Sequence, residues 1–328
     1  MIRVQPGQTE LPPAVHQPRQ QRRRGWKRYS SRTFYLFILP WLAGFLGLTL
    51  IPLIYALLVS FTNFDGISPH WHWVGLSNYR ELLRNTDTWY SLGRTLFFTV
   101  LAVPLNVAGG LGLAMLLNER VKAVGVLRTI FYVPSIVPVV ASAIMWRLIF
   151  DRDVGVLNAV LERLRIPVIT WLVDPTVFYA LLIMILWGLG GGMVISLAAL
   201  QGIPQELEEA AMVDGANGWQ IFRRVTLPLL SPVLFFQVVT GSITSLQIFV
   251  QPLLLAGNGG GVQGLGGSVP RGDFFYMINV IQQFLVFDRF GYGSAMLWIF
   301  FLVILAITLL LFRSSSFWVY YEADHDHE

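Results

Sequence analysis

The sequence contains no cysteine, and it carries little charge. Its 328 residues include no Cys, and Asp, Glu, Lys and Arg together make up 13% of them. The absence of cysteine excludes disulfides, thiolate metal sites and cysteine nucleophiles. Because about a quarter of the residues of soluble domains are charged, this composition argues against an ordinary soluble globule. The 23 Phe, 11 Trp and 11 Tyr residues argue against disorder as well.

Lysine is also scarce, since the chain holds only Lys27 and Lys122. Neither ends a G-x-x-x-x-G-K run, and the residues that follow them are Arg28 and Ala123. The chain therefore carries no P-loop for the phosphates of a nucleotide. The sequence also shows no set of nucleophile, base and orienting acid, so we predict neither catalysis nor a metal site in this chain.

Apolar sequence is abundant, and it is gathered into six long runs. Each run has 19 to 27 residues, which suits a transmembrane helix of about 20 residues. The runs are 34–60, 95–117, 131–150, 177–200, 232–255 and 294–312. None contains Asp, Glu or Lys, and Arg147 is the only charged residue in them. Because a soluble core helix of this length would show a charged stripe, we predict an all-α polytopic membrane protein with six transmembrane helices.

The first 33 residues form a basic leader that sets the predicted orientation. They hold eight Lys and Arg residues and one acid, Glu10. Because positive segments stay on the cytoplasmic side, we place both termini in the cytoplasm. Beside a membrane helix, we interpret the basic cluster as a topology signal and not as a nucleic-acid site. The predicted divisions are a partly disordered leader at 1–33, a first helix and external loop at 34–93, a five-helix core at 94–312 with a cytoplasmic loop at 201–231, and a cytoplasmic tail at 313–328.

The loop 201–231 has the pattern of a short helix, a tight turn and a second short helix. Gly215 can end the first helix in the left-handed conformation, and Asn217 can cap the second. We expect Pro228 and Pro232 to stop the chain and restart it in the fifth run. Such a loop is too structured for a simple tether and too small for an enzyme.

Two further segments carry patterns that we do not interpret as sites. Gly259, Gly261 and Gly264 match G-x-G-x-x-G, but the match follows a membrane helix instead of a strand, so a flexible loop is the better interpretation. The terminal DHDHE is interpreted as a solvated tail and not as a metal site.

The fifth run carries an uncharged polar stripe. Its members are spaced three and four residues apart, which places them on one face of a helix. They are Gln237, Thr240, Thr244, Gln247 and Gln251. Amides and hydroxyls can bind the hydroxyls of a sugar, or they can bond neighbouring helices, and the pattern leaves both uses open. The absence of acids, Lys and His from the runs argues against a proton-driven carrier and favours a neutral polar solute.

Aromatic residues and glycines near this stripe have two interpretations each. Trp187 and Phe249 can offer an apolar face to a sugar ring, or they can pack in the core. The glycines of the fourth run predict either close helix packing, which we favour, or a break in the helix. They are Gly188, Gly190, Gly191 and Gly192.

The segment 209–232 resembles the EAA motif in the permease subunits of ABC importers. In that motif E-A-A, a Gly four residues after the second Ala and a terminal L-P recur at fixed spacing. The positions on pattern are Glu209, Ala210, Ala211, Asp214, Gly215, Ala216, Phe222, Thr226, Leu227, Pro228 and Pro232. Other stretches resemble the carbohydrate-uptake branch, the MalF/UgpA-type permeases. They include VGLSNYRELL, GVLN, LAALQGIPQEL, SLQIF and FGYGSAMLW, and the resemblance covers residues 34–312.

The resemblance implies the type I importer fold and a division of labour among subunits. Two permease subunits, expected to be different chains, would form the pathway in a bacterial or archaeal cytoplasmic membrane. Two ATPase subunits would bind ATP and Mg, and an external solute-binding protein would deliver the sugar, so this chain is expected to hold no cofactor of its own. Among the positions on pattern, ATPase coupling would fall to Glu209, Ala210, Ala211, Asp214, Gly215 and Ala216. Within the fifth run, the resemblance favours Ser245 and Gln247 for the pathway.

The chain departs from the family pattern at Val250, where Asp is frequent, and at Gly191 and Gly192, where a Phe-Asn pair is frequent. Because these positions are expected near the pathway, the identity of the solute does not carry over. The alternative function is a secondary transporter or channel for a neutral polar solute, which would not require an EAA-type loop.

Overall fold

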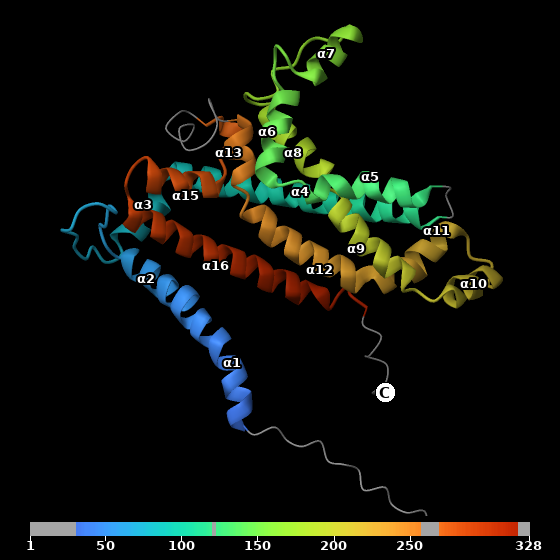
Figure 1. Ribbon diagram of the computed structural model, residues 1–328, viewed down its shortest axis with the longest axis horizontal. Helices are drawn as coiled ribbons and strands as arrows, with labels where there is room; N and C mark the ends of the chain where they lie inside the picture. Colours follow the sequence, from blue (N-terminus) through green and yellow to red (C-terminus); the bar gives the residue numbers. More distant parts are fainter. Residues whose placement is uncertain (1–30, 120–122, 257–268, 321–328) are drawn as a thin grey trace, which may run out of the picture. The chain divides into compact units, whose positions relative to one another are not determined.

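The computed structural model of the chain describes residues 31–119, 123–256 and 269–320. The basic leader, the glycine match at 259–264 and the DHDHE tail lie outside the described residues. The chain divides into two compact units, Met1–Leu53 and Ile54–Glu328. The regular structure of the described residues is helical, apart from an isolated β-bridge between Thr62 and Trp73 (Figure 1).

The first unit contains α1 (Ser31–Phe45) and the π-helical turn η1 (Leu46–Leu50), and α2 (Ile51–Val59) begins within it. The π turn ends two residues before Pro52 and contains Leu48, four residues before that proline. In a regular α-helix, the ring of a proline clashes with the carbonyl four residues back. A wider π turn at this place relieves that clash, so helical residues continue on both sides of the proline.

The second unit holds the remaining helices. In chain order they are α3 (Ser77–Arg84), α4 (Thr86–Asn118), α5 (Val124–Ile136), α6 (Val139–Ile149), α7 (Val156–Arg163), α8 (Val177–Trp187), α9 (Gly190–Gln201), α10 (Gln205–Val213), α11 (Gly218–Ile221), η2 (Phe222–Thr226), α12 (Leu227–Leu246), α13 (Val250–Ala256), η3 (Arg271–Asp273), α15 (Tyr276–Leu285) and α16 (Phe290–Ser315). At its centre α4, α9 and α12 pack against one another, and α16 packs against α12 and α15 (Figure 1).

Four described helices are long and apolar enough to cross a membrane. They are Arg32–Val59, Thr86–Asn118, Gly218–Leu246 and Phe290–Ser315. Two bent pairs pass the same test together, with bends of 99° between α5 and α6 and 41° between α8 and α9. The described residues therefore hold four candidate spans, or up to six if each bent pair is one span. The multi-helical membrane architecture is as predicted, and the count of six stays a prediction.

The two bends lie where the sequence weakens a helix. Between α5 and α6, Val137 is extended with ψ 130°, because the residue before a proline, here Pro138, avoids the helical region. Between α8 and α9, Gly188 ends the first helix. Close packing occurs beside this break, since a Cβ at Gly190 would overlap the carbonyl oxygen of Phe131. The glycine cluster thus serves both of its predicted uses.

The fifth helix differs from its prediction. The stop predicted at Pro228 and Pro232 is wrong, because the chain is helical from Gly218 to Leu246. The π turn η2 ends two residues before Pro228 and relieves the steric conflict of the ring. The helix instead ends at Gln247, inside the predicted run 232–255, and α13 restarts at Val250.

Asn158 organises the loop between α6 and α8. Its side chain is 3% exposed, and its amide nitrogen donates to the carbonyl oxygens of Arg152 (3.2 Å) and Ile169 (3.0 Å). Its amide oxygen accepts from the backbone N–H of Ile169 (3.3 Å) and the indole N–H of Trp171 (3.1 Å). One buried amide on α7 therefore joins the segment before this helix to the segment after it.

Replacing Asn158 by Leu is expected to destabilise the protein. The isosteric side chain would leave buried donors and acceptors unpaired, at a cost of about 1–3 kcal/mol for each group. Thermal unfolding in detergent should show a Tm lowered by several degrees. Val160→Thr, on the exposed side of the same helix, should leave the Tm unchanged, and an unchanged Tm for Asn158→Leu would contradict this role.

Candidate functional site

A cavity of about 750 Å³ lies between α4, α9, α12 and the segment that joins α12 to α13. None of the described residues that line it is charged. Its polar lining consists of amides and hydroxyls, from Asn106, Gln237, Thr240, Thr244, Ser245, Gln247 and Gln251. Apolar and aromatic residues form the rest, with Phe98 and Phe249 among them. The cavity can therefore offer hydrogen bonds without fixed charge, next to aromatic faces.

The break after α12 contributes directly to this cavity. Gln247, Ile248 and Phe249 lie between the two helices, and all three line the cavity together with Val250. The last turn is closed by the backbone N–H of Ile248, which donates to the carbonyl oxygen of Ser245 (3.3 Å). Interrupted helices of this kind line solute sites in many transporters, because their ends present backbone polar groups.

The structure brings the predicted polar residues together, although their helix is not continuous. Gln237, Thr240, Thr244, Ser245, Gln247, Gln251 and Phe249 all line the cavity. Trp187 is not among the lining residues, and it packs edge-on against Trp146 with ring centroids 5.8 Å apart. Of its two interpretations, the structure places Trp187 in the core.

The polar side chains differ in how far their bonding capacity is used. Gln237 is 7% exposed, and its amide donates to the hydroxyl of Ser196 on α9 at 2.9 Å, so it also bonds a neighbouring helix. Thr240 and Thr244 donate back to carbonyl oxygens of their own helix, which leaves their lone pairs available. The hydroxyl of Ser245 is buried and has no hydrogen-bond partner among the described residues. This hydroxyl is the clearest unsatisfied group in the cavity wall.

Sequence reasoning missed the contribution of α4, whereas it expected Gly191 and Gly192 of α9 near the pathway. Phe98, Ala102 and Asn106 line the cavity from one face of α4, and their spacing of four residues is the signal that could have shown it. On α9, Gly191 and Gly192 line the cavity. A Cβ at Gly191 would meet nothing closer than 3.8 Å, so the missing side chain leaves space there.

A second candidate site is the loop that contains α10 and α11. Gly215 has φ +82°, in the left-handed region that favours glycine. Its N–H donates to the carbonyl oxygen of Met212 (3.0 Å), and the N–H of Ala216 donates to that of Ala211 (3.0 Å). These bonds form a glycine-ended helix C-terminus. Gly215 therefore sets the angle between α10 and α11.

The next helix begins with a capping box between Asn217 and Gln220. The Asn217 side chain accepts from the backbone N–H of Gln220 (2.9 Å), and the Gln220 side chain accepts from that of Asn217 (2.8 Å). On α10, Glu208 accepts from the hydroxyl of Thr226 (3.5 Å). Backbone and side-chain hydrogen bonds thus fix the conformation of the turn between α10 and α11.

This loop exposes apolar side chains outside the candidate spans or at their end. The exposed fractions are 44% for Leu207, 57% for Met212, 88% for Val213 and 66% for Trp219. Glu209, Ala210, Asp214 and Gly215 are exposed too, and Ala211 and Ala216 are half-buried. An exposed apolar group of this kind, on a defined turn, is typical of a surface that contacts another protein.

Comparisons with known proteins identify the family of the chain. The family described as "Binding-protein-dependent transport system inner membrane component" matches residues 106–321. The chain is 38% identical over 296 residues to the probable ABC transporter permease protein YesP of Bacillus subtilis, covering 89% of this chain and 93% of that one. It is 34% identical over 293 residues to the trehalose/maltose transport system permease protein MalF of Thermococcus litoralis, covering 89% and 96%.

A solved structure shows the same fold. It is a bacterial ABC transporter involved in the import of the acidic polysaccharide alginate, with a TM-score of 0.76 and 22% identity over 87% of this chain and 96% of that one. With the family match spanning most of the second unit, the chain belongs to the inner membrane components of binding-protein-dependent transport systems, the multi-pass permease subunits of ABC transporters in the cytoplasmic membrane.

Proposed function

We propose that this chain is one permease subunit of an ATP-driven importer of a sugar or oligosaccharide, and that its cavity forms half of the pathway. The observation that carries this proposal is the uncharged polar lining of the cavity at the break between α12 and α13. Amides and hydroxyls beside Phe98 and Phe249 suit a molecule with many hydroxyls and apolar ring faces. Relatives named for trehalose/maltose and lactose support a sugar as the solute.

The orientation proposed here follows from the basic leader. With the leader in the cytoplasm, the Thr86 end of α4 faces outward and the loop with α10 and α11 faces the cytoplasm. The exposed surface of that loop, from Glu209 to Ala216, is then available to an ATPase subunit. The ATPase would bind ATP and Mg, since this sequence has no P-loop of its own.

The remaining partners follow from the same reasoning. A second permease subunit, expected to be a different chain, would complete the pathway. An external solute-binding protein would deliver the sugar to the Thr86 end of α4. A neighbouring structure of the alginate transporter is described in complex with such a periplasmic protein, which supports this expectation.

Reconstitution in liposomes tests the proposal. The chain is combined with the neighbouring permease and ATPase, and ATP hydrolysis is measured with binding protein loaded from a panel of sugars. Stimulation by one loaded binding protein, with uptake of that sugar, is the expected result. Uptake that continues without any ATPase would instead support the secondary transporter.

A further inference from the structure

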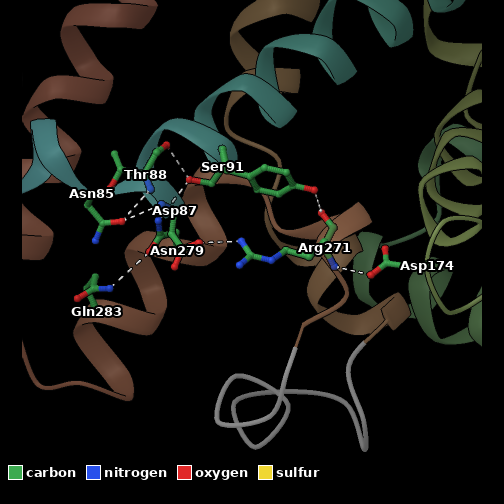
Figure 2. Close-up of polar contacts among 9 residues, drawn as sticks. Asn85, Asp87, Thr88, Ser91, Asp174, Arg271, Asn279 and Gln283 are labelled. Atoms are coloured by element: carbon green, nitrogen blue, oxygen red, sulfur yellow. Dashed lines mark hydrogen bonds and ion pairs between the residues drawn. The ribbon is translucent and has the colours of Figure 1, made fainter.

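A second polar cluster surrounds the segment before α15, which is hydrogen-bonded by Asp174 on one side and by residues of α4 on the other. Asp174, which precedes α8, accepts from the backbone N–H of Arg271 (2.7 Å) with one carboxylate oxygen and from that of Gly272 (2.6 Å) with the other. Figure 2 shows Arg271 between Asp174 and Asp87. Asp174 is 97 and 98 residues away from Arg271 and Gly272 in sequence, so these bonds join two separate loops.

The contacts on the other side of this segment come from α4. Arg94 donates its Nε–H to the carbonyl oxygen of Gly272 (2.8 Å), and the Tyr90 hydroxyl donates to that of Arg271 (3.0 Å). The guanidinium of Arg271 forms an ion pair with Asp87 at 2.7 Å. We name Arg271–Asp273 together with its four partners, Asp87, Tyr90, Arg94 and Asp174, the clasp. The exposed ion pair alone contributes little to stability, whereas the backbone contacts fix the segment in one position.

The clasp lies directly next to the wall of the cavity. Arg94 precedes Phe98 by one turn on the face of α4 that lines the cavity. The Phe98 ring packs edge-on against Phe178 (5.7 Å) and Phe275 (5.3 Å). The guanidinium carbon of Arg94 is 4.1 Å from the centroid of Phe178. A buried aromatic cluster thus separates the cavity from the clasp, and Arg94 of the clasp lies over one of its rings.

One member of the clasp, Asp273, is a buried carboxyl group whose burial disfavours the closed state. Asp273 is fully buried, and neither of its carboxylate oxygens has a hydrogen-bond partner among the described residues. Burial raises its pKa well above the ordinary value; Arg94 opposes that rise and Asp174 adds to it. The other charged groups of the clasp are Arg271 and Asp87, and α13, which also contacts η3, has no titratable residue. Closing therefore raises the proton affinity of Asp273, so rising pH favours the opened, hydrated state.

We propose that the clasp is an external latch: it seals the outer end of the pathway, and Arg271–Asp273 must leave Asp174 and α4 before a solute can reach the cavity. The proposal rests on the proposed function, which places this end of α4 outside. The physical reason is that the aromatic cluster between cavity and clasp depends on the clasp: Arg94 lies over Phe178, and the backbone N–H of Phe275 donates to the carbonyl oxygen of Asp273 (2.9 Å). Moving the segment that contains both Asp273 and Phe275 opens a route past Phe98.

A reducible cross-link tests the latch, and the natural absence of cysteine makes the labelling specific. Asp87→Cys and Arg271→Cys replace an exposed pair, with side chains 52% and 61% exposed. Joining them with a bis-methanethiosulfonate reagent should reduce sugar uptake in proteoliposomes at least tenfold, and reduction should restore it. The matched control is the pair Glu81→Cys and Arg289→Cys, which joins α3 to the start of α16 across a similar ion pair (2.6 Å). Cross-linking this control should leave uptake unchanged.

A single-cysteine reporter gives an independent measurement. Asp273→Cys should react slowly with a membrane-impermeant maleimide in the resting complex and at least tenfold faster when Asp174→Ala is added or when loaded binding protein and ATP are supplied. Equal labelling rates in all conditions, or full uptake by the cross-linked Asp87/Arg271 pair, would overturn the latch. If the unmodified complex takes up no sugar, the proposed function itself fails. Normal uptake by the cross-linked complex would reject the latch and leave the proposed function intact.

Discussion

Gly215→Leu is expected to abolish ATP-driven uptake while the protein still assembles in the membrane. Gly215 has φ +82°, and a leucine there costs about 1–2 kcal/mol in the left-handed conformation. Because no atom lies within 4 Å of a Cβ at this position, the effect is one of backbone geometry and not of crowding. The turn would relax, and the exposed surface on α10 would no longer fit its ATPase.

The measurement compares uptake with stimulated ATP hydrolysis in proteoliposomes. Uptake should fall at least tenfold, and loaded binding protein should no longer stimulate hydrolysis. Glu209→Lys reverses one exposed charge on the same surface and should have the same direction of effect. Gly218→Ala is the matched control, since that glycine also has open space around it but lacks a positive φ. Normal uptake by both Gly215→Leu and Glu209→Lys would rule out this surface as the coupling site.

Gly191→Phe is expected to block the pathway. The glycine lines the cavity, and the nearest atom to a Cβ there is Ser135 Cβ at 3.8 Å. A methyl group therefore fits, while a benzyl group must extend beyond this contact into the space that the solute would use. We expect sugar uptake to fall at least tenfold for Gly191→Phe and to stay near that of the wild type for Gly191→Ala.

The control separates loss of the cavity from loss of folding. Gly112 lies on α4, has open space around it and does not line the cavity, so Gly112→Phe should retain uptake. The quantity to compare is the uptake rate per assembled complex, determined after size-exclusion chromatography. Full uptake of an oligosaccharide by Gly191→Phe would show that the solute passes elsewhere.

The membrane helices and the turn at Gly215 could be predicted because their signals are local. Long apolar runs without acids specify helices in lipid, and a glycine followed by Asn217 specifies a turn whatever surrounds it. The members of the predicted stripe on the fifth run line one cavity, but not as one continuous helix face. The helix ends at Gln247, and tertiary packing of α13, not a continuous helix face, brings Gln251 to the same cavity.

The features that could not be predicted from sequence depend on contacts between distant segments. The second apolar run begins at residue 95, whereas α4 begins at Thr86, so Arg94 was not considered as part of a helix that lines the cavity. Its partners lie at Asp174 and in 271–273, and no local pattern relates these positions. The sequence left both a pathway position and core packing open for Trp187, and the structure shows it packed against Trp146.

The continuous helix through Pro228 and Pro232 connects the proposed coupling loop to the cavity over a long distance. Gly218–Leu246 contains 29 residues, and at 1.5 Å per residue it spans about 43 Å. One end of this rod adjoins the turn at Gly215, and the other end stops at Gln247 in the cavity wall. A tilt of about 5° about one end displaces the other by about 4 Å over that length. A small rocking motion of an ATPase against the proposed coupling loop would therefore displace the cavity wall at Gln247 by a distance comparable to the width of a sugar ring.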